Sequence, residues 1–264
     1  MRIGISVAQC DRLARPAAVV AAVKAAEQLG YSSVWVCDSV LDPAGVLSAA
    51  AAVSSRVGLG AAILVGDRED PVSLARALAT VDLLSEGRLT VTIGLRPGAG
   101  DQALDPILDA LAPGRAPVLL DGRTRRVLDL AARRAGGWSP AGVPAEHLAP
   151  LWAELRGLAA AAGRDPDDVR LVVRAGIDLA PAPAGAGRAS YQGDAEQVAG
   201  DVDATYRIGA DEVVLHLAGD LSLDEALDGY ARIAEAAELR ATQRPSYQLM
   251  NSTTPMVDPS AHST

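Results

Sequence analysis

A histidine near the carboxyl end of the chain is the side chain best suited to acid–base chemistry. His216 lies near the end of an apolar run, 211–217, which is typical of a buried strand. Imidazole is the side chain that ordinarily titrates near neutral pH. His216 is therefore a candidate catalytic residue at the mouth of the fold. The alternative interpretation is a rim residue that is hydrogen-bonded to backbone.

A Gly-Arg-Thr turn has the features of an anion site. Gly122, Arg123 and Thr124 follow the apolar run 116–120 and lead into a helical pattern over 124–135. The first N–H groups of a helix lack intrahelical partners, and the helix dipole is positive at that end, so the turn attracts an anion such as phosphate. The alternative is a surface arginine beside an N-capping threonine.

Several other chemistries lack the residues that they need. The single lysine, Lys24, falls in the first predicted helix, which leaves a Schiff-base mechanism without its nucleophile. Three histidines without a paired motif supply too few ligands for a zinc site. Four aspartates near strand ends could hold a hard cation, but they are better explained as caps and loop residues, so no metal is predicted: Asp38, Asp67, Asp121 and Asp178.

The elements that position these residues alternate along the chain. Apolar runs predict eight strands, near 2–7, 32–37, 57–64, 89–95, 116–120, 136–138, 170–178 and 211–217. Helical periodicity predicts helices near 16–29, 43–54, 71–86, 101–112, 124–135, 144–162, 194–208 and 222–240. Eight alternating units favour an α/β fold, the closed (β/α)8 TIM barrel, over an open sheet.

One arginine lies inside a predicted strand. Arg174 alternates with Val173, so its side chain points either into the barrel or toward the helix layer. An inward arginine would need an anion or a carboxylate as its partner.

Length and composition fit one barrel domain over 1–242. The 264 residues are 49% apolar, and the formal net charge of −9 argues against nucleic acid as a partner. The sequence has no apolar stretch of membrane-spanning length and no signal-peptide pattern, so we expect no membrane partner and a cytoplasmic location. Residues 243–264 are polar and aperiodic, which predicts a disordered tail or, alternatively, an arm that crosses onto a partner subunit.

Five segments in order carry a family resemblance: AAEQLGYSSVWVCDS (25–39), DPVSLARALATVDLLSEGRLTVTIG (70–94), PVLLDGRTRRVLDLAARRAGGW (117–138), AAAGRDPDDVRLVV (160–173) and GDAEQVAGDVDATYRIGADEVVLHL (193–217). Over residues 1–240 the chain resembles the luciferase-like monooxygenases. These barrel enzymes use reduced flavin mononucleotide (FMN) or an F420-type deazaflavin.

The resemblance implies roles for particular residues. Ala61 and Ala62 match a pair that the family joins by a cis peptide bond, which forms a bulge beneath the flavin ring. Arg96 matches an arginine that holds the cofactor phosphate, together here with the turn 122–124; a guanidinium suits phosphate because its planar fork donates two parallel hydrogen bonds. His216 or Asp38 would assist proton transfer.

Two departures from the family pattern bear on the activity. Ser39 stands where many deazaflavin-dependent members carry a histidine. Between Arg96 and Pro117 the family inserts a long excursion over the active site, and here the insertion after the fourth strand is short. A shortened cover leaves the site more open to water, which is harmful if a reactive oxygenated flavin must be protected.

The implied activity is a flavin-dependent oxidoreductase or monooxygenase that takes reduced FMN from a flavin reductase and oxidises a small organic substrate. A deazaflavin would instead transfer hydride without oxygen. The departures keep two alternatives open. One is a catalytically degenerate barrel that binds flavin or another ligand, or serves as the non-catalytic subunit of a dimer. The other is an enzyme that catalyses a redox-neutral reaction, with its substrate bound in the pocket that holds the cofactor in the family. The resemblance also implies a homodimer that pairs through the second and third helices, and the alanine-rich helix 43–54 would permit close approach.

Overall fold

The computed structural model describes residues 1–7, 16–37, 41–219 and 221–238. Asp38 and Ser39 lie outside the described residues, and so does the predicted tail, 243–264.

Proline and aspartate set the starts of several helices. Helix α2 (Pro43–Val53) follows Asp42, whose carboxylate accepts a hydrogen bond of 2.9 Å from Gly45 N. Helix α3 (Pro71–Leu84) follows Asp70, which caps Val72 N at 3.1 Å. In both cases a proline occupies the first turn, where a missing N–H costs nothing, and a side-chain oxygen satisfies a free donor.

The observed elements follow the predicted order closely. The strands are β1 (Ile3–Val7), β2 (Ser33–Cys37), β3 (Gly58–Val65), β4 (Leu89–Leu95), β5 (Val118–Leu120), β6 (Gly137–Trp138), β7 (Arg170–Leu179), β8 (Gln192–Gly193) and β9 (Glu212–Leu217). The remaining helices are α1 (Pro16–Leu29), α4 (Leu104–Leu111), α5 (Arg125–Arg133), α6 (Ala145–Ala161), α7 (Ala195–Ile208) and α8 (Leu223–Ala236), with 3₁₀ turns at Asp101–Ala103 and Pro166–Asp168.

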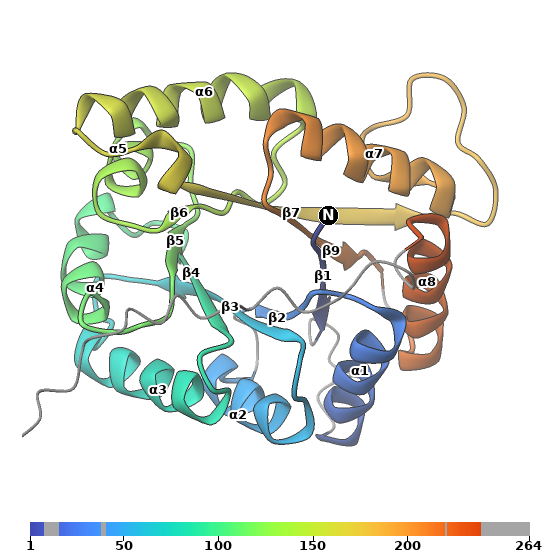
Figure 1. The fold of residues 1–264 in the computed structure, drawn as a ribbon, viewed down its shortest axis with the longest axis horizontal. Helices are drawn as coiled ribbons and strands as arrows, with labels where there is room; N and C mark the ends of the chain where they lie inside the picture. The colour runs from blue at the N-terminus through green and yellow to red at the C-terminus, as the bar shows by residue number, and fades with distance from the viewer. Residues whose placement is uncertain (8–15, 38–40, 220, 239–264) are drawn as a thin grey trace, which may run out of the picture.

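Eight of the strands close into a parallel ring. The order runs from β6 through β5, β4, β3, β2 and β1 to β9 and β7, and a pairing between β6 and β7 completes the circle. Helices α1 to α8 surround the ring (Figure 1). The predicted (β/α)8 barrel is confirmed. No helix among the described ranges is long and apolar enough to cross a membrane.

Alternation along the strands separates an outer core from the barrel interior. One set of side chains packs between strands and helices, and Ala61 and Trp138 belong to it. A second, smaller cluster fills the interior and contains Trp35, Ala62, Leu119, Val172 and Val214, with Cys37 against it. Successive residues of a strand point to opposite faces of the sheet. A residue two positions before or after one of these interior residues on the same strand therefore also faces inward.

The short insertion after β4 consists of the barrel's own elements. Between Leu95 and Val118 the chain forms a turn, the 3₁₀ turn and α4, which is amphipathic and buries Leu104, Ile107 and Leu111. Among the described residues this segment contains no further helix or strand that would cover the mouth.

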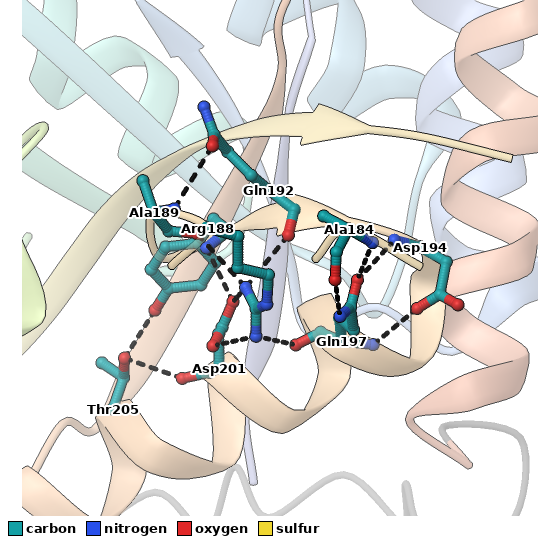
Figure 2. Close-up of polar contacts among 9 residues, drawn as sticks. Ala184, Arg188, Ala189, Gln192, Asp194, Gln197, Asp201 and Thr205 are labelled. Carbon is teal, nitrogen blue, oxygen red and sulfur yellow. Dashed lines mark hydrogen bonds and ion pairs between the residues drawn. The ribbon is translucent and has the colours of Figure 1, made fainter. Parts of the chain in front are cut away.

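The longer excursion lies instead between β7 and α7, where sequence periodicity predicts no element. There the two-residue strand β8 extends the carboxyl end of β7, pairing Asp178 with Gln192. Figure 2 shows the contacts that hold this excursion in place. Arg188 Nη1 and Nη2 donate to the two oxygens of the Asp201 carboxylate, at 2.6 and 2.9 Å, and Nη1 also donates to the Gln192 carbonyl. A bidentate pair of this kind holds the loop against α7.

Candidate functional site at the barrel mouth

An ion pair forms part of the floor of the mouth. Arg174 Nη2 donates to Asp121 Oδ2, and both side chains are partly buried, with 14% and 23% of their surfaces exposed. Val172, two residues before Arg174, belongs to the interior cluster, so Arg174 also points inward. The expectation that an inward arginine finds a carboxylate is confirmed. The described residues contain no group of three potential metal ligands.

Backbone pairing at the strand ends holds this ion pair in place. Asp121 N donates to the Ile93 carbonyl at 2.8 Å, which prolongs the β4–β5 ladder by one residue. Arg174 Nε and Nη2 also donate to the Ser139 carbonyl, at 3.4 and 3.3 Å. The guanidinium is thus held on one side. Its Nη1 group has no hydrogen-bond partner among the described residues and keeps two donors for a ligand.

Two inward glycines leave room around the ion pair. A side chain at Gly94 would come within 3.3 Å of Asp121 Cβ, so the bare glycine lets the carboxylate lie against β4. Gly176, the next inward position on β7 after Arg174, is exposed, and a Cβ built there meets nothing within 4 Å. The space beside Arg174 toward the rim is therefore open.

His216 borders this open space. It pairs with Gly176 across β9 and β7, and Val214, two residues earlier, belongs to the interior cluster, so the imidazole faces inward. Burial lowers the pKa of His216, which keeps the ring neutral at pH 7. The imidazole has no hydrogen-bond partner in the described part of the chain, so the interpretation as a rim residue bonded to backbone finds no support there.

Two hydroxyl groups lie buried in the same region without partners. Thr92 on β4 lines up with Ala62 and Leu119, both in the interior cluster, and Ser139 follows β6 beside Asp121. Thr92 Oγ1 and Ser139 Oγ are buried and make no hydrogen bond. Native interiors rarely leave such groups unsatisfied, so they mark a polar region at the base of the mouth.

The two predicted phosphate-binding elements lie on the same rim of the barrel. Arg96 follows β4, and Gly122 and Arg123 follow β5, and these strands are paired neighbours. Both arginines are exposed. Their backbones therefore leave neighbouring strands at the carboxyl end of the barrel.

Thr124, in contrast, is already engaged. Its hydroxyl accepts from Val127 N at 3.2 Å as the N-cap of α5 and donates to Asp101 Oδ2 at 2.9 Å. The capping interpretation of Thr124 is therefore confirmed. A carboxylate at this position opposes a second anion at the start of α5, because like charges repel.

The two alanines do not form the expected bulge. No cis peptide bond occurs in the described ranges, so the bond between Ala61 and Ala62 is trans. Both residues pair in unbroken register with β2 and β4, and a regular ladder of this kind leaves no place for a bulge. Ala61 faces the helix layer, and only Ala62 faces the interior.

Sequence reasoning missed part of the mouth. Asp121 is weighed there only as a metal ligand, and Thr92 and Ser139 are not singled out. The signal that could have found them is strand alternation combined with register, since Thr92 lies at an inward position of β4, and Asp121 and Ser139 at inward positions directly after β5 and β6.

Comparison with known proteins gives these observations a context. The family described as luciferase-like monooxygenase matches residues 1–107. An uncharacterized protein of Mycobacterium tuberculosis is 39% identical over 80 residues, which span 30% of this chain and 27% of that protein. The 5,10-methylenetetrahydromethanopterin reductase of Methanopyrus kandleri is 34% identical over 86 residues, 32% of this chain and 24% of the reductase. The matches thus span about a quarter of these relatives' length.

Solved structures extend the likeness to the whole fold. A monooxygenase from Streptomyces bottropensis superposes with a TM-score of 0.70 at 17% identity, covering 89% of this chain and 98% of that one. The coenzyme F420 dependent tetrahydromethanopterin reductase from Methanopyrus kandleri gives 0.69 at 15%, covering 90% and 98%. These likenesses show the fold. The likeness to the luciferase-like monooxygenase family at the level of sequence lies in the first 107 residues of the chain.

Proposed function

We propose that this chain is a flavin- or deazaflavin-dependent oxidoreductase that holds the cofactor ring in the mouth of the barrel. The observation that carries the proposal is the set of unused polar groups gathered there: Arg174 Nη1 and the imidazole of His216, beside the open space at Gly176. A planar heterocycle with hydrogen-bonding edges matches such a site. The family match and the related monooxygenase and reductase structures support the same class of ligand.

The residues present fit the two parts of the cofactor unequally. The mouth offers donors, a neutral imidazole and room for a ring. At the rim, Arg96 and Arg123 would hold the phosphate through their guanidinium groups, whereas Thr124 and the start of α5 contribute little because Asp101 lies there. When bound, the ring supplies hydride or electron transfer, which no side chain of the protein can perform.

The protein's own residues would bind and orient the ligand and move a proton. Neutral His216 can accept the proton that a substrate hydroxyl or amine loses as it is oxidised, at its free ring nitrogen, and release it to solvent. Ala62 and the ion pair Asp121–Arg174 would support the ring from below. Asp38 lies outside the described residues, and its role in proton transfer stays a prediction.

A flavin titration tests the proposal. FMN and its 5-deaza analogue are titrated with protein, and binding is followed by the change in ring fluorescence. We expect dissociation constants in the micromolar range. Replacing Arg96 with alanine should weaken FMN binding about tenfold, because a charge-assisted hydrogen bond to phosphate is lost. Riboflavin, which lacks the phosphate, should bind the variant as it binds the native protein.

The control is Arg156→Ala, a half-buried arginine of α6 that pairs with Asp167. It should leave FMN affinity unchanged. If neither FMN nor its 5-deaza analogue binds at micromolar concentration, the oxidoreductase proposal is wrong. The ligand-binding barrel without oxidative chemistry, which the Asp101 carboxylate at the phosphate-binding turn favours, then takes its place.

Oxygen uptake separates the two oxidative activities. With a generic flavin reductase and reduced FMN, a monooxygenase consumes oxygen in step with substrate. A deazaflavin enzyme transfers hydride and consumes none. We propose a small organic substrate.

A further inference from the structure

We propose that the Asp121–Arg174 pair is the binding site for a cyclic imide or lactam edge, presented by the flavin or deazaflavin ring. This inference rests on the proposed function and goes further, because it names the part of the ring that meets the floor of the mouth.

The ion pair presents a donor beside an acceptor. Arg174 Nη1 keeps two N–H groups without partners among the described residues. The Asp121 carboxylate accepts one bond from Arg174 and a long one, 3.3 Å, from Ala141 N. A carboxylate has about four acceptor positions, so some remain for a ligand. A C=O group next to an N–H group is the complement of this arrangement.

Charge selects the same class of ligand. Arg174 and Asp121 neutralise each other, so the floor carries no net charge that would attract an ion into the mouth. A neutral cyclic amide instead gains hydrogen bonds to both partners, and bonds to ionised groups are stronger than those between neutral groups. The pyrimidine part of a flavin carries this pattern, with an N3–H between two carbonyls.

The Asp121–Arg174 pair is accessible from the mouth of the barrel. The pair is held from the side by Ser139 and Ala141, and it keeps exposed surface of 14% and 23%. Gly176, the next inward residue of β7 toward the rim, contributes no side chain. A flat ring can therefore descend along β7 until its edge meets the pair.

The test compares FMN with 3-methyl-FMN, in which a methyl group replaces the N3–H donor. With the native protein we expect 3-methyl-FMN to bind about tenfold more weakly, because a hydrogen bond to a carboxylate is lost. The 5-deaza analogue and its N3-methyl derivative should show the same ratio. This comparison needs no substitution and so does not depend on whether a variant folds.

A double variant then locates the discrimination. Replacing Asp121 with leucine and Arg174 with methionine removes both partners at once, so that no charge stays buried alone. The ratio between FMN and 3-methyl-FMN should fall below about twofold. The control, Arg125→Met with Glu154→Leu, removes an ion pair between α5 and α6 and should keep the native ratio.

A second arm distinguishes the ring from a substrate with the same chemistry. Uracil and 3-methyluracil are titrated and followed by protein NMR. Equal affinity of the native protein for each compound and its N3-methyl form overturns the inference, as does a ratio that survives in the double variant. If neither FMN nor its deaza analogue binds but uracil binds in preference to 3-methyluracil, the proposed function fails while the imide site stands.

Discussion

Burial of His216 makes the stability of the protein depend on pH. Burial lowers the pKa of this imidazole, so the folded protein binds fewer protons than the unfolded chain near and below the usual histidine pKa of about 6.5. The free energy of unfolding should therefore be fully retained above that pH and decrease as the solution is acidified. The same neutral ring is what proton acceptance in the mouth requires.

Replacing His216 with glutamine should weaken this dependence. Urea unfolding at about pH 7.5 and pH 5 gives the loss of stability on acidification, and the variant should lose less than the native protein. His147→Gln, at an exposed position of α6, is the control and should behave like the native chain. An identical acid loss in the His216 variant would show that this imidazole does not contribute.

Asp101 should act on phosphate selectivity, since its carboxylate lies at the predicted phosphate-binding turn and accepts from Thr124. In the Asp101→Asn variant one negative charge disappears from the start of α5, and a helix N-terminus favours anions. FMN affinity should rise about two- to fivefold relative to riboflavin. Asp129→Asn, at the Arg133 pair on the outside of α5, should leave the ratio unaltered. An unchanged ratio in the Asp101 variant would contradict the proposed repulsion.

At single positions the sequence predicts what depends on local pattern. Turn chemistry and strand alternation each left two alternatives, and the structure has the capping one for Thr124 and the inward one, with a carboxylate partner, for Arg174. The contact of Asp101 with Thr124 joins two loops 23 residues apart, and no local pattern encodes it. The predicted cis bond between Ala61 and Ala62 was wrong. It came from resemblance alone, whereas β3 pairs in unbroken register with both of its neighbours.

Among the elements, β7 borders the open space of the proposed ligand site. Gly176 lies on its inward face, where an added Cβ would meet nothing within 4 Å, so a large side chain would occupy the ligand's space without disturbing the fold. Gly176→Leu should weaken FMN binding at least about tenfold and leave the unfolding midpoint equal or higher, because glycine is unfavourable in strands. Gly157→Leu, at an exposed glycine of α6 with equally open surroundings, is the matched control. Unaltered FMN affinity in Gly176→Leu would place the ring elsewhere.

On strand β3 the inward glycine, Gly60, is closely packed, in contrast to Gly176 on β7. The indole of Trp35 fills the place of a side chain at Gly60, where a Cβ would lie 2.0 Å from Trp35 Cδ2, and Trp35 Nε1 donates to Ser33 Oγ at 2.8 Å. Gly60→Ala should therefore destabilise the protein by about 1–3 kcal/mol through overpacking. Urea unfolding measures the effect. Gly176→Ala, an alanine in open space, should cost far less, and equal losses would contradict the packing argument.

Most element boundaries could be predicted because helices and strands here are marked by prolines, capping aspartates and apolar runs. The excursion after β7 could not. It is held by the pair of Arg188 with Asp201 (Figure 2). Tyr191 N also donates to Asp201, and Tyr191 has a φ of +65°; neither feature has a signature in hydrophobic periodicity. A loop fixed by polar contacts carries no repeating pattern that sequence reasoning can detect.

At the scale of the whole molecule, the barrel leaves one apolar face without a partner in the described part of the chain. Helix α3 exposes Val72, Leu83 and Leu84, with 62%, 79% and 54% of their surfaces accessible. Apart from Met1, these are the large hydrophobic residues that lie exposed within the described ranges. Val72 lies at the start of α3 and Leu83 and Leu84 at its end, and exposed apolar side chains on one helix can mark a protein–protein contact.

We therefore expect a homodimer that pairs through α2 and α3. A twofold contact uses the same surface of both subunits, so both copies of Leu83 and of Leu84 would be buried in the interface. Sedimentation velocity over a range of concentrations should give a dimer for the native chain. Leu83→Glu with Leu84→Glu should shift it to monomer, because burying four carboxylates at one interface is strongly unfavourable. The Arg76→Glu variant changes a charge on the same helix and removes none of the exposed leucines, so more of it should remain dimeric than of the double leucine variant. A native protein that sediments as a monomer at every concentration would contradict the dimer and leave the α3 face without this role.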